Sequence, residues 1–233
     1  MEITDPERTV VVVRPARRAR QARPSRFYAR YGKRALDLVV AWAVLALTAP
    51  LLATIALAVR LDSPGPALFA QERLGQDARP FRLYKFRTMR ADADPALHAA
   101  HVRRLIAANT TPEVGSSLKL AHDPRITRVG RWLRRTSLDE LPQFWNVVRG
   151  EMSVVGPRPD VAYAVEAYPA WWRGRFRGMP GITGLWQVEA RNRVSYEAMI
   201  GLDLAYFERM SLGLDLALIA RTPWSMLHGA GAG

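Results

Sequence analysis

The 233-residue sequence contains no cysteine. This absence excludes disulfides, thiolate catalysis, zinc ribbons and iron–sulfur sites. Acidic residues are also scarce: 21 Asp or Glu stand against 34 Lys or Arg, and the formal net charge is +13 at pH 7. The four histidines show no spacing typical of metal ligands.

The basic excess is concentrated at the N-terminus. Residues 1–34 contain ten Lys or Arg and three Asp or Glu, which is +7 of the total charge. Pro15 and Pro24 interrupt this region, and proline breaks a helix interior. We expect residues 1–30 to form a disordered basic tail that can attract anionic lipid headgroups. No nucleic-acid recognition motif accompanies it, so no nucleic-acid partner is expected.

A long apolar run follows the tail. Leu38–Val59 is 22 residues without a charge. As a helix this run would measure about 33 Å, against about 30 Å for the hydrocarbon core of a bilayer. A secretory signal peptide would have a much shorter charged region before it. The sequence therefore predicts that residues 31–62 form a membrane segment.

Pro50 lies near the middle of this segment and leaves two topologies open. Proline removes a helical hydrogen bond and favours a bend, so the chain could enter and leave by the same membrane face. Basic residues prefer the cytoplasmic side, and they flank both ends, at Arg30, Lys33, Arg34 and Arg60. A straight crossing with a tolerated kink is the alternative. The residues alone favour neither topology.

Residues 63–233 are predicted to form a catalytic domain of the α/β class, mainly helical with a small β-hairpin. Alternating runs and a turn predict the hairpin over 64–89. Apolar periodicity predicts the other elements: helices around 129–135 and 141–148, a short strand at 153–155, and amphipathic helices at 195–209 and 212–227, which we expect to lie at the membrane interface.

The densest group of charged residues surrounds Asp139 and Glu140. Arg131, Arg134 and Arg135 come just before them. Ser137 and Glu140 also match a helix capping box, which needs no catalytic role. An ionised carboxylate beside arginines that grip phosphate can instead attack phosphorus. Two adjacent carboxylates can hold one Mg²⁺ as well.

Other basic residues support a phosphate-rich substrate. Arg158 stands between two prolines, which hold its backbone in place. Lys85 and Arg87 are expected on one face of the second hairpin strand. Each of these could be an ordinary solvated charge. Together with the acidic pair they favour a phosphate-binding site.

Two further patterns concern the C-terminal third. Aromatic and basic residues alternate over 171–177, and we interpret them first as a belt at the membrane interface, with stacking on a base or burial in a loop as alternatives. Asp203 lies on an apolar helical stripe. A carboxylate there needs an arginine or a metal as partner, and we expect an ion pair.

Three motifs resemble those of one family. These are Tyr84–Met89 (YKFRTM), Arg134–Gln143 (RRTSLDELPQ) with Gly156–Pro159 (GPRP), and Pro180–Val188 (PGITGLWQV). The chain resembles the bacterial sugar transferases, the monotopic polyprenyl-phosphate phosphoglycosyl transferases, from about Tyr31 to Thr222. It looks like their minimal type, with one membrane segment.

The resemblance implies an activity. Such enzymes transfer a sugar 1-phosphate from a UDP-sugar to a polyprenyl (undecaprenyl) phosphate and release UMP, with Mg²⁺ as cofactor. It implies that Asp139 is the nucleophile that forms a covalent phosphosugar intermediate. Glu140 would be its partner in metal binding or proton handling, and Arg134 and Arg158 would bind phosphate.

The resemblance also implies a location. It places a re-entrant membrane helix broken at Pro50 in the bacterial inner membrane, with the catalytic domain in the cytoplasm. Membrane lipid is then a partner, and a homo-oligomer stays open. Two rival hypotheses are a non-catalytic protein that binds acidic lipid or nucleic acid, and a glycosidase. Adjacent carboxylates cannot easily flank a glycosidic bond from opposite sides.

Overall fold

The structure is a computed structural model, and it describes residues 27–90, 100, 102–104, 106, 125–190 and 194–228. Of the predicted tail over 1–30, residues 1–26 lie outside the described residues, and 27–30 are helical. The described chain begins with a π-helical turn, Tyr28–Gly32, that continues into α1 (Lys33–Asp62). Tyr28 is buried. The folded chain thus begins before residue 31, where the membrane segment was expected to start.

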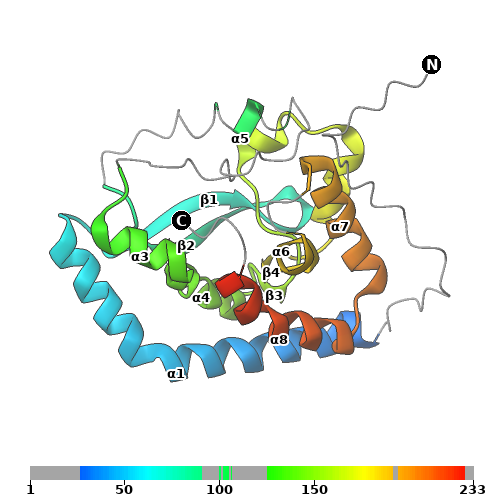
Figure 1. Cartoon of the computed structure of the whole chain (residues 1–233). Coiled ribbons are helices and arrows are strands. Elements are labelled where there is room, and N and C mark those ends of the chain that lie inside the picture. Colours follow the sequence, from blue (N-terminus) through cyan, green and yellow to red (C-terminus); the bar gives the residue numbers. More distant parts are fainter. Residues whose placement is uncertain are drawn as a thin grey trace, which may run out of the picture.

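Helix α1 is one helix that contains Pro50. Figure 1 shows that it changes direction near its middle and that the hairpin lies on its concave side. Proline at this position explains the bend, because it cannot donate to the preceding turn. The expected break is thus a bend within a continuous helix. Among the described residues, only the helical segment Tyr28–Asp62 is long and apolar enough to cross a membrane, with a mean hydropathy of 2.3 in its most apolar window.

The first half of α1 is held by polar contacts. Arg34 donates to the backbone carbonyls of Val147 (2.6 Å) and Val148 (2.9 Å) at the end of α4 (Gln143–Arg149). The buried Asp37 accepts hydrogen bonds from the hydroxyl of Ser153 and the amide of Val154, both at 2.9 Å. These bonds satisfy a charge that would be costly to bury alone. They attach this end of α1 to the body of the protein.

A second polar contact holds the start of α1. The ammonium of Lys33 lies 2.8 Å from the carboxylate of Asp215, which is fully buried. Asp215 belongs to α8 (Leu212–His228) and also accepts from the hydroxyls of Tyr28 (2.6 Å) and Tyr206 (2.8 Å). Three donors around one carboxylate explain its burial.

The last turn of α1 is held by Arg87. Its buried guanidinium donates to the carbonyls of Val59 (3.3 Å), Ser63 (2.7 Å) and Pro64. Helix ends leave carbonyls without partners, so a cation is stabilising there. Asp62 accepts from the amide of Val129 (3.0 Å) in the first turn of α3 (Arg128–Thr136). The same domain therefore holds both ends of α1.

Two small sheets form the centre of the fold (Figure 1). The expected hairpin is confirmed as β1 (Leu68–Leu74) and β2 (Pro80–Phe86), paired antiparallel with Phe69 opposite Lys85. The second sheet pairs β3 (Ser153–Val155) with β4 (Gly181–Thr183) in parallel. A parallel pair needs a crossover, and this one contains α5 (Ala162–Val165) and the 3₁₀ segment Ala170–Arg177.

The remaining helices close the domain: α6 (Leu185–Glu189), α7 (Tyr196–Arg209) and α8. The expected helices at 195–209 and 212–227 are confirmed to within a residue. One core cluster joins Ala41 of α1 to Leu83, Val147 and Leu218. Another packs Ile55 and Val59 of α1 against Phe86 and Leu133. Both halves of α1 therefore contribute to the core.

An apolar surface lies outside this core. On α1 the most exposed large side chains include Leu47 (82%) and Leu61 (79%), and on α8 Trp224 is 67% exposed. Trp42 of α1 meets Trp145 of α4 edge to face, and both are exposed. Exposed apolar patches of this extent mark a partner surface or a membrane.

We predict that Arg87→Met destabilises the fold. Hydrogen bonds from a charged donor are worth about 1.5–3 kcal/mol each, so loss of all three should lower the midpoint of thermal unfolding by at least about 10 °C. Detergent-solubilised protein followed by circular dichroism measures this midpoint. Arg90→Met is the matched control, because Arg90 is exposed. An equal midpoint for the two variants would contradict the structural role of Arg87.

Candidate functional site

The acidic pair occupies a tight turn between two helices. Leu138–Glu140 forms a 3₁₀ turn between α3 and α4. Ser137, which precedes it, has a left-handed backbone (φ 55°) and makes no side-chain capping bond. The capping-box interpretation is therefore wrong, because a residue that ends α3 in this conformation cannot also cap the next helix. Asp139 is buried in the turn.

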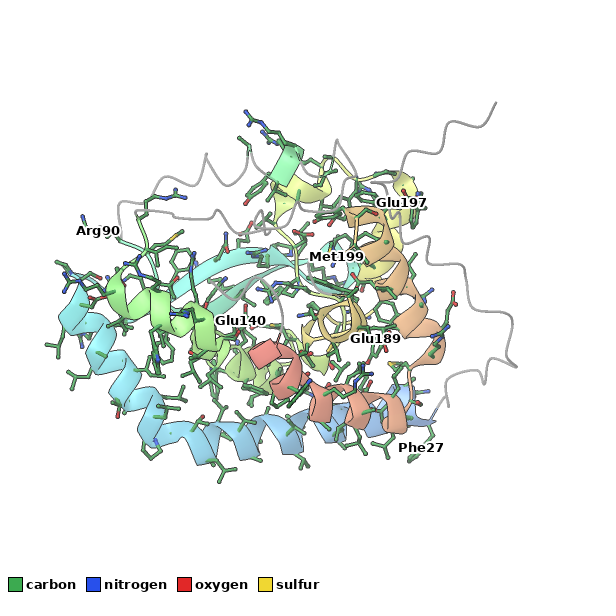
Figure 2. All side chains as sticks on the ribbon, viewed as in Figure 1. Phe27, Arg90, Glu140, Glu189, Glu197 and Met199 are labelled. Carbon is green, nitrogen blue, oxygen red and sulfur yellow. The ribbon has the colours of Figure 1, made fainter. Side chains whose placement is uncertain are left out.

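Glu140 and Arg158 form a two-pronged ion pair. The guanidinium Nη2 of Arg158 lies 2.5 Å from Oε1 of Glu140, and Nη1 lies 3.3 Å from Oε2. The negative charge of Glu140 raises the pKa of Arg158 above its ordinary value. The sequence predicted both residues, and the structure brings them together from segments 18 residues apart. Figure 2 shows Glu140 toward the middle of the molecule, away from Phe27 and Glu197 at its periphery.

Lys85 of β2 is the third charged partner. Burial lowers the pKa of Lys85 to about 7, and the positive charges of Arg73 and Arg158 act in the same direction. Glu140 and Asp139 partly oppose this shift. The amine therefore loses its charge as the pH rises through neutrality. A phosphate that entered the site would favour the protonated form.

The other two predicted phosphate-binding residues lie in different surroundings. Arg134, near the end of α3, donates from Nε to the hydroxyl of Thr88 at 2.9 Å. The guanidinium of Arg87 instead donates hydrogen bonds to backbone carbonyls at the end of α1. The expectation that Arg87 grips phosphate with Lys85 is corrected by this placement, because a buried fork bound to backbone carbonyls is not presented to a ligand.

A buried polar network lies next to Arg158, and no sequence pattern predicted it as a whole. Asp160 accepts from Arg175 (2.9 Å) and from the hydroxyls of Tyr168 and Tyr196. Burial alone would raise the pKa of Asp160, but these partners hold it below its ordinary value. Arg175 also lies 2.8 Å from Asp203, which confirms the expected ion pair. Asp203 was the only hint of this network in the sequence, because a carboxylate on an apolar helical stripe needs a buried partner.

The interface interpretation of residues 171–177 is wrong for three of their six aromatic and basic side chains, while Trp171, Arg173 and Arg177 are exposed. Trp172 and Phe176 are buried in an aromatic core with Tyr168 and Tyr196, where Trp172 stacks on Tyr196 with ring centroids 5.4 Å apart. Arg175 is 2% exposed. Alternation of aromatics and cations does not reveal which face is buried, so the sequence could not separate these cases.

The arrangement as a whole suits phosphate chemistry. It combines a buried carboxylate, a second carboxylate fixed by arginine, and a lysine whose charge responds to its surroundings. Carboxylate oxygens are the donors that Mg²⁺ prefers. Asp139 and Glu140 both supply oxygens of this kind, and Glu140 also pairs with Arg158. The described residues contain no group of three acidic or histidine side chains that could hold a metal by themselves. The site thus suits a phosphate-bearing ligand, in a domain that also carries one exposed apolar helix.

Comparisons with known proteins give the family. Residues 28–229 match the bacterial sugar transferase family. The exopolysaccharide production protein ExoY of Rhizobium meliloti is 40% identical over 190 residues, which is 82% of this chain and 83% of that protein. The chain belongs to the bacterial sugar transferase family.

Longer relatives match over a part of their length. The UDP-galactose-lipid carrier transferase of Erwinia amylovora is 42% identical over 203 residues, 87% of this chain and 42% of that protein. The UDP-glucose:undecaprenyl-phosphate glucose-1-phosphate transferase of Escherichia coli is 39% identical over 198 residues, 82% of this chain and 39% of that protein. The chain thus spans about two fifths of these two relatives.

We predict that Lys85 reacts with acylating reagents near neutral pH. Only the uncharged amine reacts, so the labelling rate of the native protein should rise with a midpoint near pH 7. In denatured protein the same residue should titrate near the ordinary lysine value of about 10.4. Mass spectrometry of the Lys85 peptide after brief labelling at a series of pH values measures both midpoints. Identical midpoints in native and denatured protein would refute the shift.

Proposed function

We propose that this protein transfers a sugar 1-phosphate from a UDP-sugar to a polyprenyl phosphate, such as undecaprenyl phosphate, and releases UMP. The observation that carries the proposal is the meeting of Asp139, Glu140, Arg158 and Lys85 in a domain attached to an exposed apolar helix. A diphosphate donor needs the cations, and a lipid acceptor needs the apolar surface. The names of the Erwinia and Escherichia relatives agree with this pair of substrates.

In the first step, Asp139 acts as the nucleophile. A carboxylate oxygen of Asp139 attacks the phosphorus that carries the sugar, and the bond from this phosphorus to the oxygen of UMP breaks. UMP leaves with the electron pair of that bond. The product is an acyl phosphate between Asp139 and the sugar phosphate.

In the second step, a phosphate oxygen of the polyprenyl phosphate attacks the same phosphorus. The acyl phosphate bond breaks and the carboxylate of Asp139 is restored. One phosphoanhydride is exchanged for another over the two steps, so the net reaction is close to thermoneutral.

The basic residues stabilise the charge that moves during these steps. Arg158 is held in line by the two oxygens of Glu140, so its fork is already oriented when the donor arrives. We assign Glu140 this orienting task. Lys85 supplies a positive charge that a bound phosphate would stabilise. Arg134 is hydrogen-bonded to Thr88, which follows the second strand of the hairpin.

Mg²⁺ is the proposed cofactor, and Asp139 and Glu140, together with the diphosphate of the donor, would hold it. When bound, the ion supplies positive charge that stabilises the leaving phosphate. This assignment rests on the chemistry of the carboxylate donors and on the resemblance of the motifs.

We propose a re-entrant membrane helix in the bacterial inner membrane, with the domain on the cytoplasmic side. Arg34 and Asp37 bind the domain at one end of α1, and Asp62 binds it at the other. One domain cannot lie on both sides of a membrane. Only 11% of the most apolar 18-residue stretch of this helix is buried, so the region around the bend at Pro50 can insert into the lipid. The exposed apolar face of α8 would lie in the interface.

We predict that Asp139→Asn abolishes turnover without loss of the fold, because an amide has the shape of a carboxylate but cannot attack phosphorus. Wild-type enzyme quenched after mixing with UDP-sugar alone should carry a sugar-phosphate adduct on Asp139, which mass spectrometry detects. Asp77→Asn is the matched control, since Asp77 is exposed in the hairpin turn. Near-normal turnover by the Asp139→Asn enzyme would exclude Asp139 as the nucleophile.

The topology gives a further prediction. Single cysteines at Ser25 and at the exposed Gln76 should both resist a maleimide that cannot cross the inner membrane until the cells are opened. The absence of native cysteine makes the labelling specific. Labelling of Ser25→Cys in intact cells, with Gln76→Cys protected, would establish a straight crossing.

A further inference from the structure

The segment that carries Arg158 has no secondary structure of its own. Each of its four successive carbonyls accepts a hydrogen bond from a different donor. The four donors are the amide of Gly181 to Pro157 (2.8 Å), Nη2 of Arg175 to Arg158 (2.9 Å), Nη1 of Arg73 to Pro159 (3.2 Å) and the amide of Leu74 to Asp160 (2.8 Å). The hairpin, β4 and the 3₁₀ segment therefore fix this backbone from three sides.

The backbone packs too closely on one side to shift. A Cβ at Gly181 would lie 2.1 Å from the amide nitrogen of Gly156 and 2.5 Å from the carbonyl of Thr183. The amides of Gly156 and Gly181 are themselves bonded, to Thr183 and Pro157. The start of the segment is thus locked into the parallel sheet. The bond to the carbonyl of Arg158 itself comes from a side chain.

That side chain, Arg175, is held by fixed partners. It is 2% exposed, and its guanidinium contacts the carboxylates of Asp160 (2.9 Å) and Asp203 (2.8 Å) and the hydroxyl of Tyr168 (2.8 Å). Two carboxylates balance its charge, which makes burial tolerable. Asp203 is on α7 and 1% exposed, so it cannot reach a substrate. Arg175 therefore contacts the segment that carries Arg158 twice, at the carbonyl of Arg158 itself and at the carboxylate of Asp160.

We propose that Arg175 is a positioning residue for Arg158: its guanidinium, braced by Asp160 and Asp203, sets the backbone from which the Arg158 fork reaches Glu140 and the transferring phosphate. This inference rests on the proposed function. Arg175 touches neither substrate nor reacting atoms. It acts through the carbonyl of Arg158, so its effect should require the arginine fork at position 158.

A double-mutant cycle tests this dependence. Lysine at position 158 keeps the charge but loses the planar fork, so Arg158→Lys should lower kcat by about 10–100-fold. Arg175→Lys in the wild-type background should lower kcat, and the single-turnover rate of UMP release, by about 10–100-fold because the fork is misplaced. The KM for the UDP-sugar should change less. In the Arg158→Lys background, Arg175→Lys should cost less than about 3-fold, since there is no fork left to place.

Arg177→Lys is the matched control. Arg177 is two residues away on the same segment and exposed, and it donates to the carbonyl of Leu204. This variant should keep the wild-type kcat. Size-exclusion chromatography and circular dichroism establish which variants are folded. If Arg175→Lys does not fold, the double-mutant cycle is repeated with Asp203→Asn in its place. We expect this variant to lower kcat by about 5-fold in the wild-type background and not to lower it in the Arg158→Lys background.

The outcomes separate the two proposals. Equal factors in both backgrounds, or unchanged kcat for Arg175→Lys, would overturn the positioning role while the proposed function stands. A wild-type protein that transfers no sugar phosphate from any UDP-sugar would overturn the proposed function itself.

Discussion

The structure depends on the polar contacts that hold both ends of one apolar helix against a single domain. Lys33, Arg34 and Asp37 hold its first half, and Arg87 holds its last turn. Each contact pairs a charge with a backbone group or an opposite charge, so burial does not leave it unsatisfied. The middle of the helix makes few such contacts and remains exposed and apolar. A membrane and a catalytic domain can therefore share one rigid element.

The proposed active site is built on the same principle of paired charges. Both oxygens of Glu140 contact the guanidinium of Arg158, and Asp160 and Asp203 form ion pairs with the neighbouring Arg175. Charges arranged in this way need little reorganisation when a diphosphate arrives, which is the property that stabilises a transition state most effectively. Lys85 is the exception, because its charge depends on what enters the site.

Several features were accessible from the sequence because they are local. The long uncharged run, the alternation of the hairpin and the periodicity of the last two helices depend on neighbouring residues. Asp203 was also interpretable, since a carboxylate on an apolar stripe requires a buried cation. The sequence could not name Arg175 as that cation. It comes from another segment, and the aromatic residues around it suggested a surface instead.

The sequence by itself determined that one segment is too apolar for water, that Pro50 removes a helical hydrogen bond near its middle, and that carboxylates and basic residues occur in a pattern typical of phosphate chemistry. Only the tertiary structure decided which of those charges meet. It gave Arg87 and Lys85 different surroundings, although the two are only two residues apart, and it joined Glu140 to Arg158. It also turned Ser137 into the end of one helix instead of the cap of the next. The physical reason is that ion pairs and buried hydrogen bonds are short-ranged and join elements distant in the sequence, and no local pattern encodes which elements will touch.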